Sequence, residues 1–151
     1  MPRIDIEYLG KPEIDAIGLS NDEILAAVEG GLVAAGRGQT VIEPRMHLTP
    51  DPAFNGHFNV LRGYVAPLGL AGVKVVGDYV DNYKAGLPSE LALLNLFDPR
   101  TGMPKAVIDA SDLTPRTVHA LHDPAEIMAE IARVRAQGAA VSGQADQEGL
   151  R

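Results

Sequence analysis

Strand-length apolar segments follow one another through the middle of the chain with only short turns between them. A parallel pair of strands needs a crossover of about a dozen or more residues, whereas antiparallel strands can be joined by a tight turn. Most linkers here are too short for a crossover helix, so the sequence predicts a mixed, largely antiparallel sheet. The expected strands are Thr40–Leu48, His57–Val65, Val73–Tyr79, Leu91–Phe97 and Pro104–Ala110.

Two amphipathic helices are expected beside these strands, which makes the fold class α+β. Ser20 and Glu23 have the spacing of a capping box, and apolar residues recur at helical intervals over Asn21–Ala35. The apolar stripe of this helix needs the sheet to cover it. A second capped pattern predicts a C-terminal helix over Pro124–Gln137, and residues 139–151 are expected to fray. A further strand is expected at the N-terminus, where apolar and acidic residues alternate as far as Gly10.

Charge and composition exclude several classes of partner. The chain has 13 Lys+Arg against 20 Asp+Glu and no basic run, so we expect no nucleic-acid binding. The longest apolar stretch, Val65–Val76, is interrupted and falls short of the ~20 residues that span a bilayer, so no membrane partner is expected. The chain contains no cysteine, and its N-terminus lacks the apolar core of a secretory signal. A cytoplasmic protein is therefore expected.

Motifs for cofactors and metals are not apparent in the sequence. A dinucleotide-binding unit needs a strand, a G-x-G-x-x-G turn and then a helix, whereas Gly36-Arg37-Gly38 follows its helix. His119 and His122 are expected to be solvated, because no carboxylate cluster accompanies them. We therefore expect no Rossmann domain, no bound cofactor and no metal in this chain.

A series of short motifs nevertheless occurs in a recognisable order between residues 43 and 110. Together they resemble the ornithine cyclodeaminase/mu-crystallin family, over about residues 1–114. The motifs are Glu43–Leu48, Ala71–Val76, Asp81-Asn82, Gly86–Ser89, Leu94–Gly102 and Asp109-Ala110.

This resemblance implies a function for residues 1–114. In the family, an N-terminal domain binds the substrate and forms a homodimer, and a following Rossmann domain binds NAD(P). Members resemble amino-acid cyclodeaminases, imine reductases and amino-acid dehydrogenases, so the implied ligand is a small amino or imino acid. Residues 115–151 depart from the family pattern and resemble a stretch of isocitrate-lyase-regulator-type effector domains. The NAD(P) of the full-length family is accordingly not expected in this chain.

Two basic residues match family positions that carry chemistry. Arg45 matches the arginine that holds the substrate carboxylate, and a planar guanidinium can pair with both carboxylate oxygens. Lys74 matches the lysine at the reacting end of the substrate, so it is the candidate catalytic residue and also contacts substrate. It lies in an apolar strand, where partial burial would lower its pKa. Without the motif, the residues alone favour a surface cation in both cases.

Four further residues are candidate substrate contacts. His47 lies two positions after Arg45 and is expected on the same side of its strand, where a structural role is equally compatible. Asp81 and Asn82 match a loop beside the family's site, although a plain polar turn has the same composition. Arg116 matches a second carboxylate-binding arginine, in a segment that is one residue short and contains Pro115.

Two functional hypotheses from different classes follow. In the first, the chain is the substrate-binding and dimerisation portion of an NAD(P)-dependent enzyme and is inactive alone, because the cofactor domain is missing. In the second, it is a non-catalytic ligand-binding or assembly module. A regulatory protein is the third interpretation, and the absence of a helix-turn-helix pattern argues against it.

Overall fold

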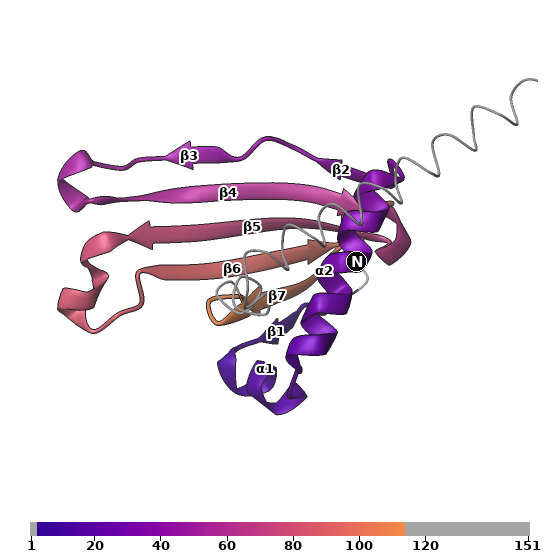
Figure 1. Cartoon of the computed structure of the whole chain (residues 1–151), viewed down its shortest axis with the longest axis horizontal. Helices are drawn as coiled ribbons and strands as arrows, with labels where there is room; N and C mark the ends of the chain where they lie inside the picture. Colours follow the sequence, from indigo (N-terminus) through magenta and orange to yellow (C-terminus); the bar gives the residue numbers. More distant parts are fainter. Residues whose placement is uncertain (1–2, 114–151) are drawn as a thin grey trace, which may run out of the picture.

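The computed structural model describes residues 3–113, and a single seven-stranded sheet organises them (Figure 1). The strand order is β1-β7-β6-β5-β4-β2, and β3 also pairs with β4. All pairs are antiparallel except β1 with β7, which confirms the predicted α+β fold with a mixed, largely antiparallel sheet. The strands are β1 (Glu7–Leu9), β2 (Thr40–Ile42), β3 (Met46–Leu48), β4 (Gly56–Val65), β5 (Leu70–Tyr79), β6 (Glu90–Phe97) and β7 (Pro104–Asp109).

Two α-helices precede the main part of the sheet. Helix α2 (Asn21–Gly36) begins where predicted, and the Ser20 hydroxyl accepts a hydrogen bond from the Glu23 amide at 3.2 Å. Helix α1 (Lys11–Ile17) was not predicted. Its signals are a proline in the first turn and a Glu13 carboxylate that accepts the Gly10 amide at 3.0 Å. The sequence analysis ended the first strand near Gly10 and assigned no element to this stretch.

The segment predicted as one strand, Thr40–Leu48, is two short strands separated by residues 43–45. Pro44 has no amide hydrogen, so it cannot donate to the neighbouring strand. The connection is held by Arg62 of β4 instead. Its guanidinium lies 3.5 Å from the Pro44 carbonyl and 3.7 Å from the Glu43 carboxylate. The break therefore has a fixed attachment to the sheet.

The remaining connections between strands are short turns. The predicted hairpin at Asp98–Gly102 is confirmed, and the Asp98 carboxylate accepts the backbone amides of Arg100 at 2.8 Å and Thr101 at 3.2 Å. Gly102 adopts φ +71°, which a residue with a Cβ rarely adopts. Short 3-10 helices occupy the other turns, namely η1 (Pro52–Phe54), η2 (Ala66–Leu68) and η3 (Val80–Ala85).

The pairing register defines two faces of the sheet, because residues directly opposite each other share a face. The lysine face contains Lys74, which lies opposite Leu61 of β4 and Leu94 of β6. The small buried core lies on this face and comprises Val76, Ala92 and Ala110, with Leu94 packed against it. The apolar face contains the alternate positions, including Val75 and Leu93.

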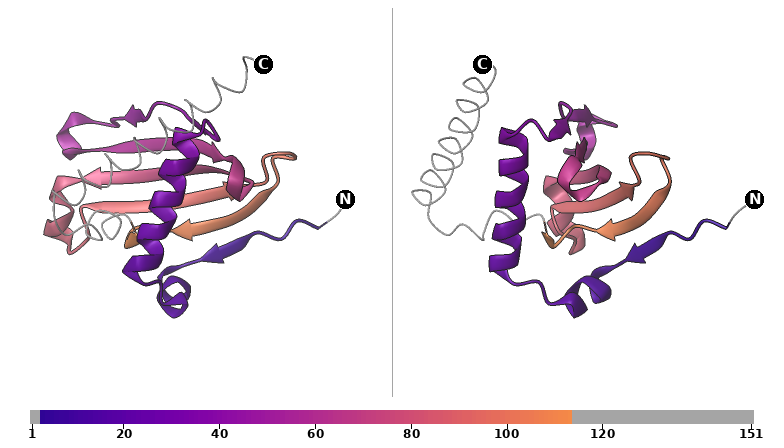
Figure 2. Two further views of the ribbon diagram at one scale, coloured as in Figure 1. Left: turned by 45° about the vertical axis from the view of Figure 1, so that its right-hand side comes forward. Right: turned by 90° about the vertical axis from the view of Figure 1, so that its right-hand side faces the viewer.

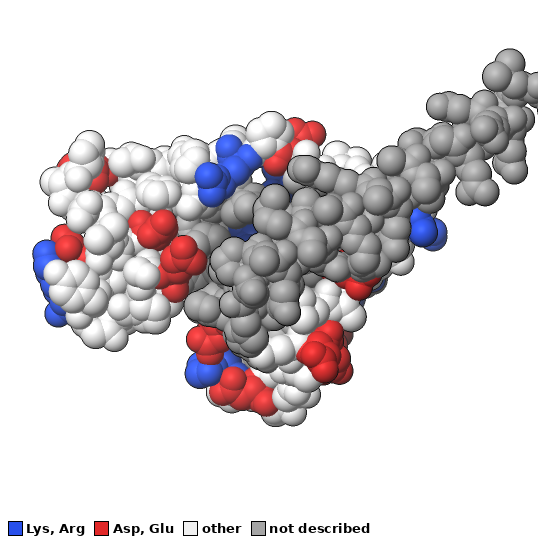
Figure 3. Space-filling model, viewed as in Figure 1, with Lys and Arg blue, Asp and Glu red and all other residues white. Residues whose placement is uncertain are grey.

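Helix α2 crosses one face of the sheet in the views of Figures 1 and 2. Figure 3 shows acidic side chains on that same side, over the ends of β5 and β6, where the register places Asp78 and Glu90. The helix therefore crosses the lysine face. The expected cover of its apolar stripe is only partial, since Ile24 is buried while Leu32 remains 43% exposed.

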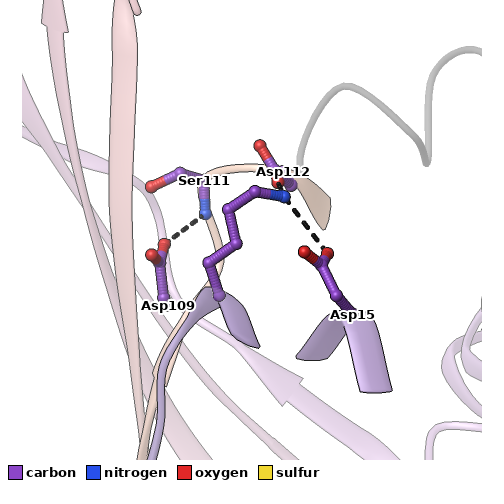
Figure 4. A network of polar contacts seen from close by, with 5 residues as sticks. Asp15, Asp109, Ser111 and Asp112 are labelled. Atoms are coloured by element: carbon purple, nitrogen blue, oxygen red, sulfur yellow. Dashed lines mark hydrogen bonds and ion pairs between the residues drawn. The ribbon is translucent and has the colours of Figure 1, made fainter. Parts of the chain in front are cut away.

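A polar network ties the first helix to the end of the last strand (Figure 4). The ammonium of Lys11 pairs with the carboxylate of Asp15 at 3.1 Å and also with Asp112. Hydrogen bonding to Asp112, followed by that to Asp15, raises the pKa of Lys11 above its usual value. On the neighbouring turn, the Asp109 carboxylate accepts the Ser111 amide at 3.0 Å. The parallel edge formed by β1 and β7 is thus fastened beyond its backbone pairing.

Two glycine substitutions are expected to change stability in opposite directions. At Gly56, an added Cβ would lie 2.2 Å from the Tyr79 ring, so Gly56→Ala should destabilise the fold by about 1–3 kcal/mol through overpacking. At Gly30, in the interior of α2, an added Cβ meets nothing within 4 Å, so Gly30→Ala should stabilise by about 0.5–1 kcal/mol. Urea unfolding of both variants measures the two effects. An unchanged free energy of unfolding in Gly56→Ala would contradict the close packing of Tyr79 on Gly56.

Several predicted features lie outside the described residues. They are the C-terminal helix over Pro124–Gln137, the remainder of residues 115–151, and Arg116. Within residues 3–113, no helix is long and apolar enough to cross a bilayer.

Candidate functional site

Lys74 lies at the middle of β5, where its side chain is half-buried. Its direct cross-strand neighbours, Leu61 and Leu94, are both apolar. Burial therefore lowers the pKa of Lys74, and the nearby charge of Glu90 partly opposes that shift. A desolvated ammonium of this kind attracts an anionic group more strongly than an ammonium in water does.

Arg45 lies in the break between β2 and β3, one residue before the β3 register begins. Because Met46 lies opposite Val60, a continued register places position 45 opposite Leu61, and Leu61 is in turn opposite Lys74. Two strand spacings of about 4.8 Å then separate the Arg45 and Lys74 backbones by roughly 10 Å. Arg45 is exposed and has no ion-pair partner among residues 3–113. Arg45 itself lies outside the sheet pairing, which in β3 begins at Met46.

The next row of the lysine face contains imidazole and amide groups. His47 of β3 lies opposite Asn59 of β4, and the rings of His47 and His57 are 5.3 Å apart. The Asn59 amide nitrogen lies 3.2 Å from Nε2 of His57. Asn59 is 8% exposed, and its amide oxygen has no hydrogen-bond partner among residues 3–113. The register places His47 on the same face as Lys74, although Arg45 itself precedes the strand.

Carboxylates occupy the far end of the same face. Asp78 of β5 lies opposite His57 of β4 and Glu90 of β6. It is four residues beyond Lys74, which is about 13 Å along an extended strand. The lysine face therefore changes from cationic at Arg45 and Lys74, through His57 and Asn59, to anionic at Asp78 and Glu90.

Asp81 and Asn82 organise the connection between β5 and β6. The Asp81 carboxylate pairs with Lys84 at 2.9 Å, and this bond is the main reason that its pKa is lowered. The Asn82 side-chain amide donates to the Pro88 carbonyl at 2.7 Å. Asn82 also lines a hollow on the apolar face. These contacts assign both residues to the loop structure, and a role in substrate binding remains only a prediction.

The described residues do not fit a dinucleotide or a metal ion. No strand among them leads through a glycine-rich turn into a helix, since β1 is followed by Gly10 and the seven-residue α1. In the same part of the chain, no three His, Asp or Glu side chains gather in a cluster that could hold a metal ion.

The apolar face has a different character. A hollow of about 540 Å³ lies over β4, β5 and β6. Around it, apolar side chains of the same face remain unusually exposed, including Tyr8 at 66% and Leu93 at 45%. The residues that line the hollow include Phe58, Val75, Tyr79, Leu91 and Leu93.

Sequence reasoning missed His57, Asn59, Asp78 and Glu90. The signal was present in β4, where polar residues at 57 and 59 alternate with Phe58 and Val60. Such alternation marks one polar face and one apolar face. It could not show that the polar face also contains Lys74, because that depends on the register between β4 and β5.

Comparison with known proteins decides the family. The sequence profile of the ornithine cyclodeaminase/mu-crystallin family matches residues 13–121. The chain belongs to this family. The site described above is therefore a site of an ornithine cyclodeaminase/mu-crystallin protein, and the resemblance inferred from the ordered motifs is confirmed.

The similar proteins include a dehydrogenase, a reductase and a cyclodeaminase. An alanine dehydrogenase of Archaeoglobus fulgidus is 31% identical over 106 residues, which is 70% of this chain and 31% of that protein. A Thermococcus litoralis Δ1-pyrroline-2-carboxylate reductase, solved with NADH and L-proline, is 28% identical with TM-score 0.72 over 76% of this chain and 35% of its own. A lysine cyclodeaminase, solved to explain recognition of L-lysine, L-ornithine and L-2,4-diaminobutyric acid, is 26% identical with TM-score 0.66, over 78% and 36%.

The chain spans about a third of the length of these relatives. The matched third contains the sheet, Lys74 and Arg45. The activities that the relatives' names describe belong to proteins more than twice as long as this chain.

Proposed function

We propose that residues 3–113 form the substrate-binding and dimerisation part of an NAD(P)-dependent enzyme that acts on small amino or imino acids. The observation that carries this proposal is the half-buried Lys74 on the face of a family sheet, with Arg45 in the break between β2 and β3 at the edge of the same sheet. Two cations at this separation suit a small molecule with a carboxylate at one end.

Arg45 is the carboxylate anchor in this proposal. A guanidinium can donate two parallel hydrogen bonds to one carboxylate, which fixes the orientation of the ligand as well as its position. Lys74 acts at the reacting end, where its lowered pKa favours proton transfer or polarisation of a carbon–nitrogen bond. His47, one row away, helps to orient the ligand.

The cofactor belongs to another part of the enzyme in this proposal. The family relatives include proteins crystallised with NAD and NADH, whereas residues 3–113 contain no turn suited to a dinucleotide pyrophosphate. We therefore infer that this chain alone is inactive. A cytoplasmic location agrees with the absence of cysteine from the whole sequence.

We also infer that the apolar face is the homodimer surface. One similar structure, 30% identical, is that of an archaeal alanine dehydrogenase dimer. On this chain, exposed apolar side chains gather on one sheet face around a hollow, and such patches mark association surfaces. A second copy of the chain would cover both the exposed apolar side chains and the hollow.

A thermal-shift titration of the purified chain tests the proposal. Alanine, proline, ornithine and lysine are titrated separately from NADH and NADPH. A ligand at about 100 times its dissociation constant should stabilise the fold by about 2.7 kcal/mol. We expect a saturable shift with at least one amino acid and none with either nucleotide. A shift with NADH alone would contradict the proposal, and the absence of any shift would favour a pure assembly module.

The pH dependence of ligand binding provides a second check. The protonated form of Lys74 also attracts the carboxylate that Arg45 anchors, so affinity should fall as the pH rises through the lowered pKa of Lys74, below the range of an ordinary lysine. In Lys74→Arg, the guanidinium at position 74 stays positively charged over the whole pH range of the experiment. The ratio of wild-type to Lys74→Arg affinity cancels titration of the ligand itself and should decline with rising pH. A constant ratio between pH 7 and the ordinary lysine pKa of about 10.4 would rule out the lysine as the titrating group.

A further inference from the structure

Residues 3–6, which we call the arm, form an extended segment that leads directly into β1 (Figure 2). Its side chains alternate as those of a strand do, with Ile4 and Ile6 on one side. On the other side, the guanidinium of Arg3 pairs with the carboxylate of Asp5 at 2.7 Å. Such alternation is typical of a strand with one buried side. In the single chain, however, the apolar side of the arm is exposed, by 56% at Ile4 and 51% at Ile6.

The arm extends beyond the strand that pairs with β1. Strand β1 pairs with β7 over Glu7–Leu9, in parallel register. Continued by two residues, this register would place Asp5 beside Pro104, which is the first residue of β7 and has no amide hydrogen to donate. The pairing of the sheet therefore ends before it reaches the arm, and the apolar side of the arm needs cover from another surface.

The apolar side of the arm continues the apolar face of the sheet. Tyr8 of β1 lies two positions after Ile6, on the same side of the chain, and its partner on β7 is Val107. Val107 lies opposite Asn95, which lies opposite Val73 of the apolar face. Figure 2 shows β1 and the arm running away from helix α2, on the opposite side of the sheet. The arm thus projects past the sheet on the side that the proposed homodimer covers.

We propose that the arm is an exchanged contact of the homodimer, in which Ile4 and Ile6 of each protomer pack on the apolar face of its partner. The inference rests on the proposed function and adds a segment to the interface inferred there. A second copy is the partner that fits, because the arm is continuous with the face that such a copy covers. The exposed side chains of that face, Tyr8 at 66% and Leu93 at 45%, offer the apolar surface that an isoleucine needs in order to leave water.

Serine substitutions on the apolar side of the arm test the proposal. In a twofold dimer each contact occurs twice, so a change in the arm removes two contacts. The dimer dissociation constant of Ile4→Ser/Ile6→Ser should therefore rise at least about 100-fold, since burying an isoleucine side chain is strongly favourable. Sedimentation velocity of the purified 151-residue chain over a concentration series measures it. Both side chains are exposed in the single chain, so the urea midpoint of the monomer should not change.

The charged side of the arm provides the matched control. Arg3→Ser/Asp5→Ser changes the same short segment, but its ion pair is exposed and contributes little. We expect this variant to dimerise with a dissociation constant within about threefold of the wild-type value. Equal weakening by both double variants would show that the arm acts through its backbone or its general order and not through its apolar side, and the proposal would be wrong.

Thiol labelling gives a second measurement, because the chain contains no cysteine. The thiol of Ile6→Cys should react quickly at concentrations below the dimer dissociation constant and slowly above it. The thiol of Asp5→Cys, on the outer side of the arm, should react quickly at both concentrations. Slow labelling of Ile6→Cys at every concentration would show that its own chain covers the arm, which would overturn the exchange.

The outcomes separate this inference from the proposed homodimer. If Ile4→Ser/Ile6→Ser dimerises as the wild type does, whereas Leu93→Asp is monomeric, the arm plays no part and the apolar face remains the interface. If the wild-type chain is itself a monomer throughout the concentration series, the proposed homodimer and the arm contact fail together.

Discussion

Replacing Arg45 by alanine is expected to weaken amino-acid binding by at least about 30-fold, because losing one partner of a buried charge pair typically costs 2–5 kcal/mol. Arg45 is exposed in the unliganded chain, so the loss should appear in ligand affinity and not in the stability of the unliganded fold. Calorimetric titration with the best amino acid from the thermal-shift panel measures it.

Two further variants make the Arg45 result specific. Arg45→Lys retains the charge but not the bidentate geometry, and should bind with intermediate affinity. Arg37→Ala removes an equally exposed arginine just after α2 and should bind as the wild type does. If Arg45→Ala and Arg37→Ala have the same affinity as the wild-type chain, Arg45 is not the carboxylate anchor.

Replacing Leu93 by aspartate is expected to convert the proposed homodimer into a monomer. Leu93 lines the hollow on the apolar face and is 45% exposed in the single chain. A carboxylate buried at this position would lose its hydration without gaining a partner, which costs several kcal/mol. The dimer dissociation constant should therefore rise at least about 100-fold. Sedimentation velocity across a concentration series measures it.

Leu32→Asp is the matched control for the dimer experiment. Leu32 is 43% exposed and lies on α2, which crosses the opposite face of the sheet. This variant should remain a dimer. Dissociation of both variants would indicate a general loss of folding, and dissociation of Leu32→Asp alone would move the interface to the helix side.

The main strands were predictable because their apolar segments are bounded by strong turn signals. The structure extends the predicted Val73–Tyr79 strand back to Leu70 and changes the ends of the following two strands by one residue. Helix α2 was predictable from its capping box. Helix α1 was not, because seven residues contain too few turns to establish a helical period. The break at residues 43–45 also escaped prediction, although Pro44 gives a physical reason for it.

The candidate site was predictable only in part. Lys74 and Arg45 were found through their resemblance to family motifs, since neither a strand lysine nor an exposed arginine is informative alone. Asn59 and His57 required the register between β4 and β5, which the sequence does not specify residue by residue. A one-residue slip of that register would have moved both to the opposite face.

The parallel edge of the sheet has a consequence for how the chain folds during its synthesis. Strands β4 to β7 form a meander, so each hairpin can pair soon after its second strand leaves the ribosome. Strand β1 emerges first but pairs only with β7, through Glu7 with Ala106 and its neighbours. Strand β1 is consequently the first of the seven strands to be made and the last to pair, and it stays unpaired until almost all of residues 3–113 have been translated.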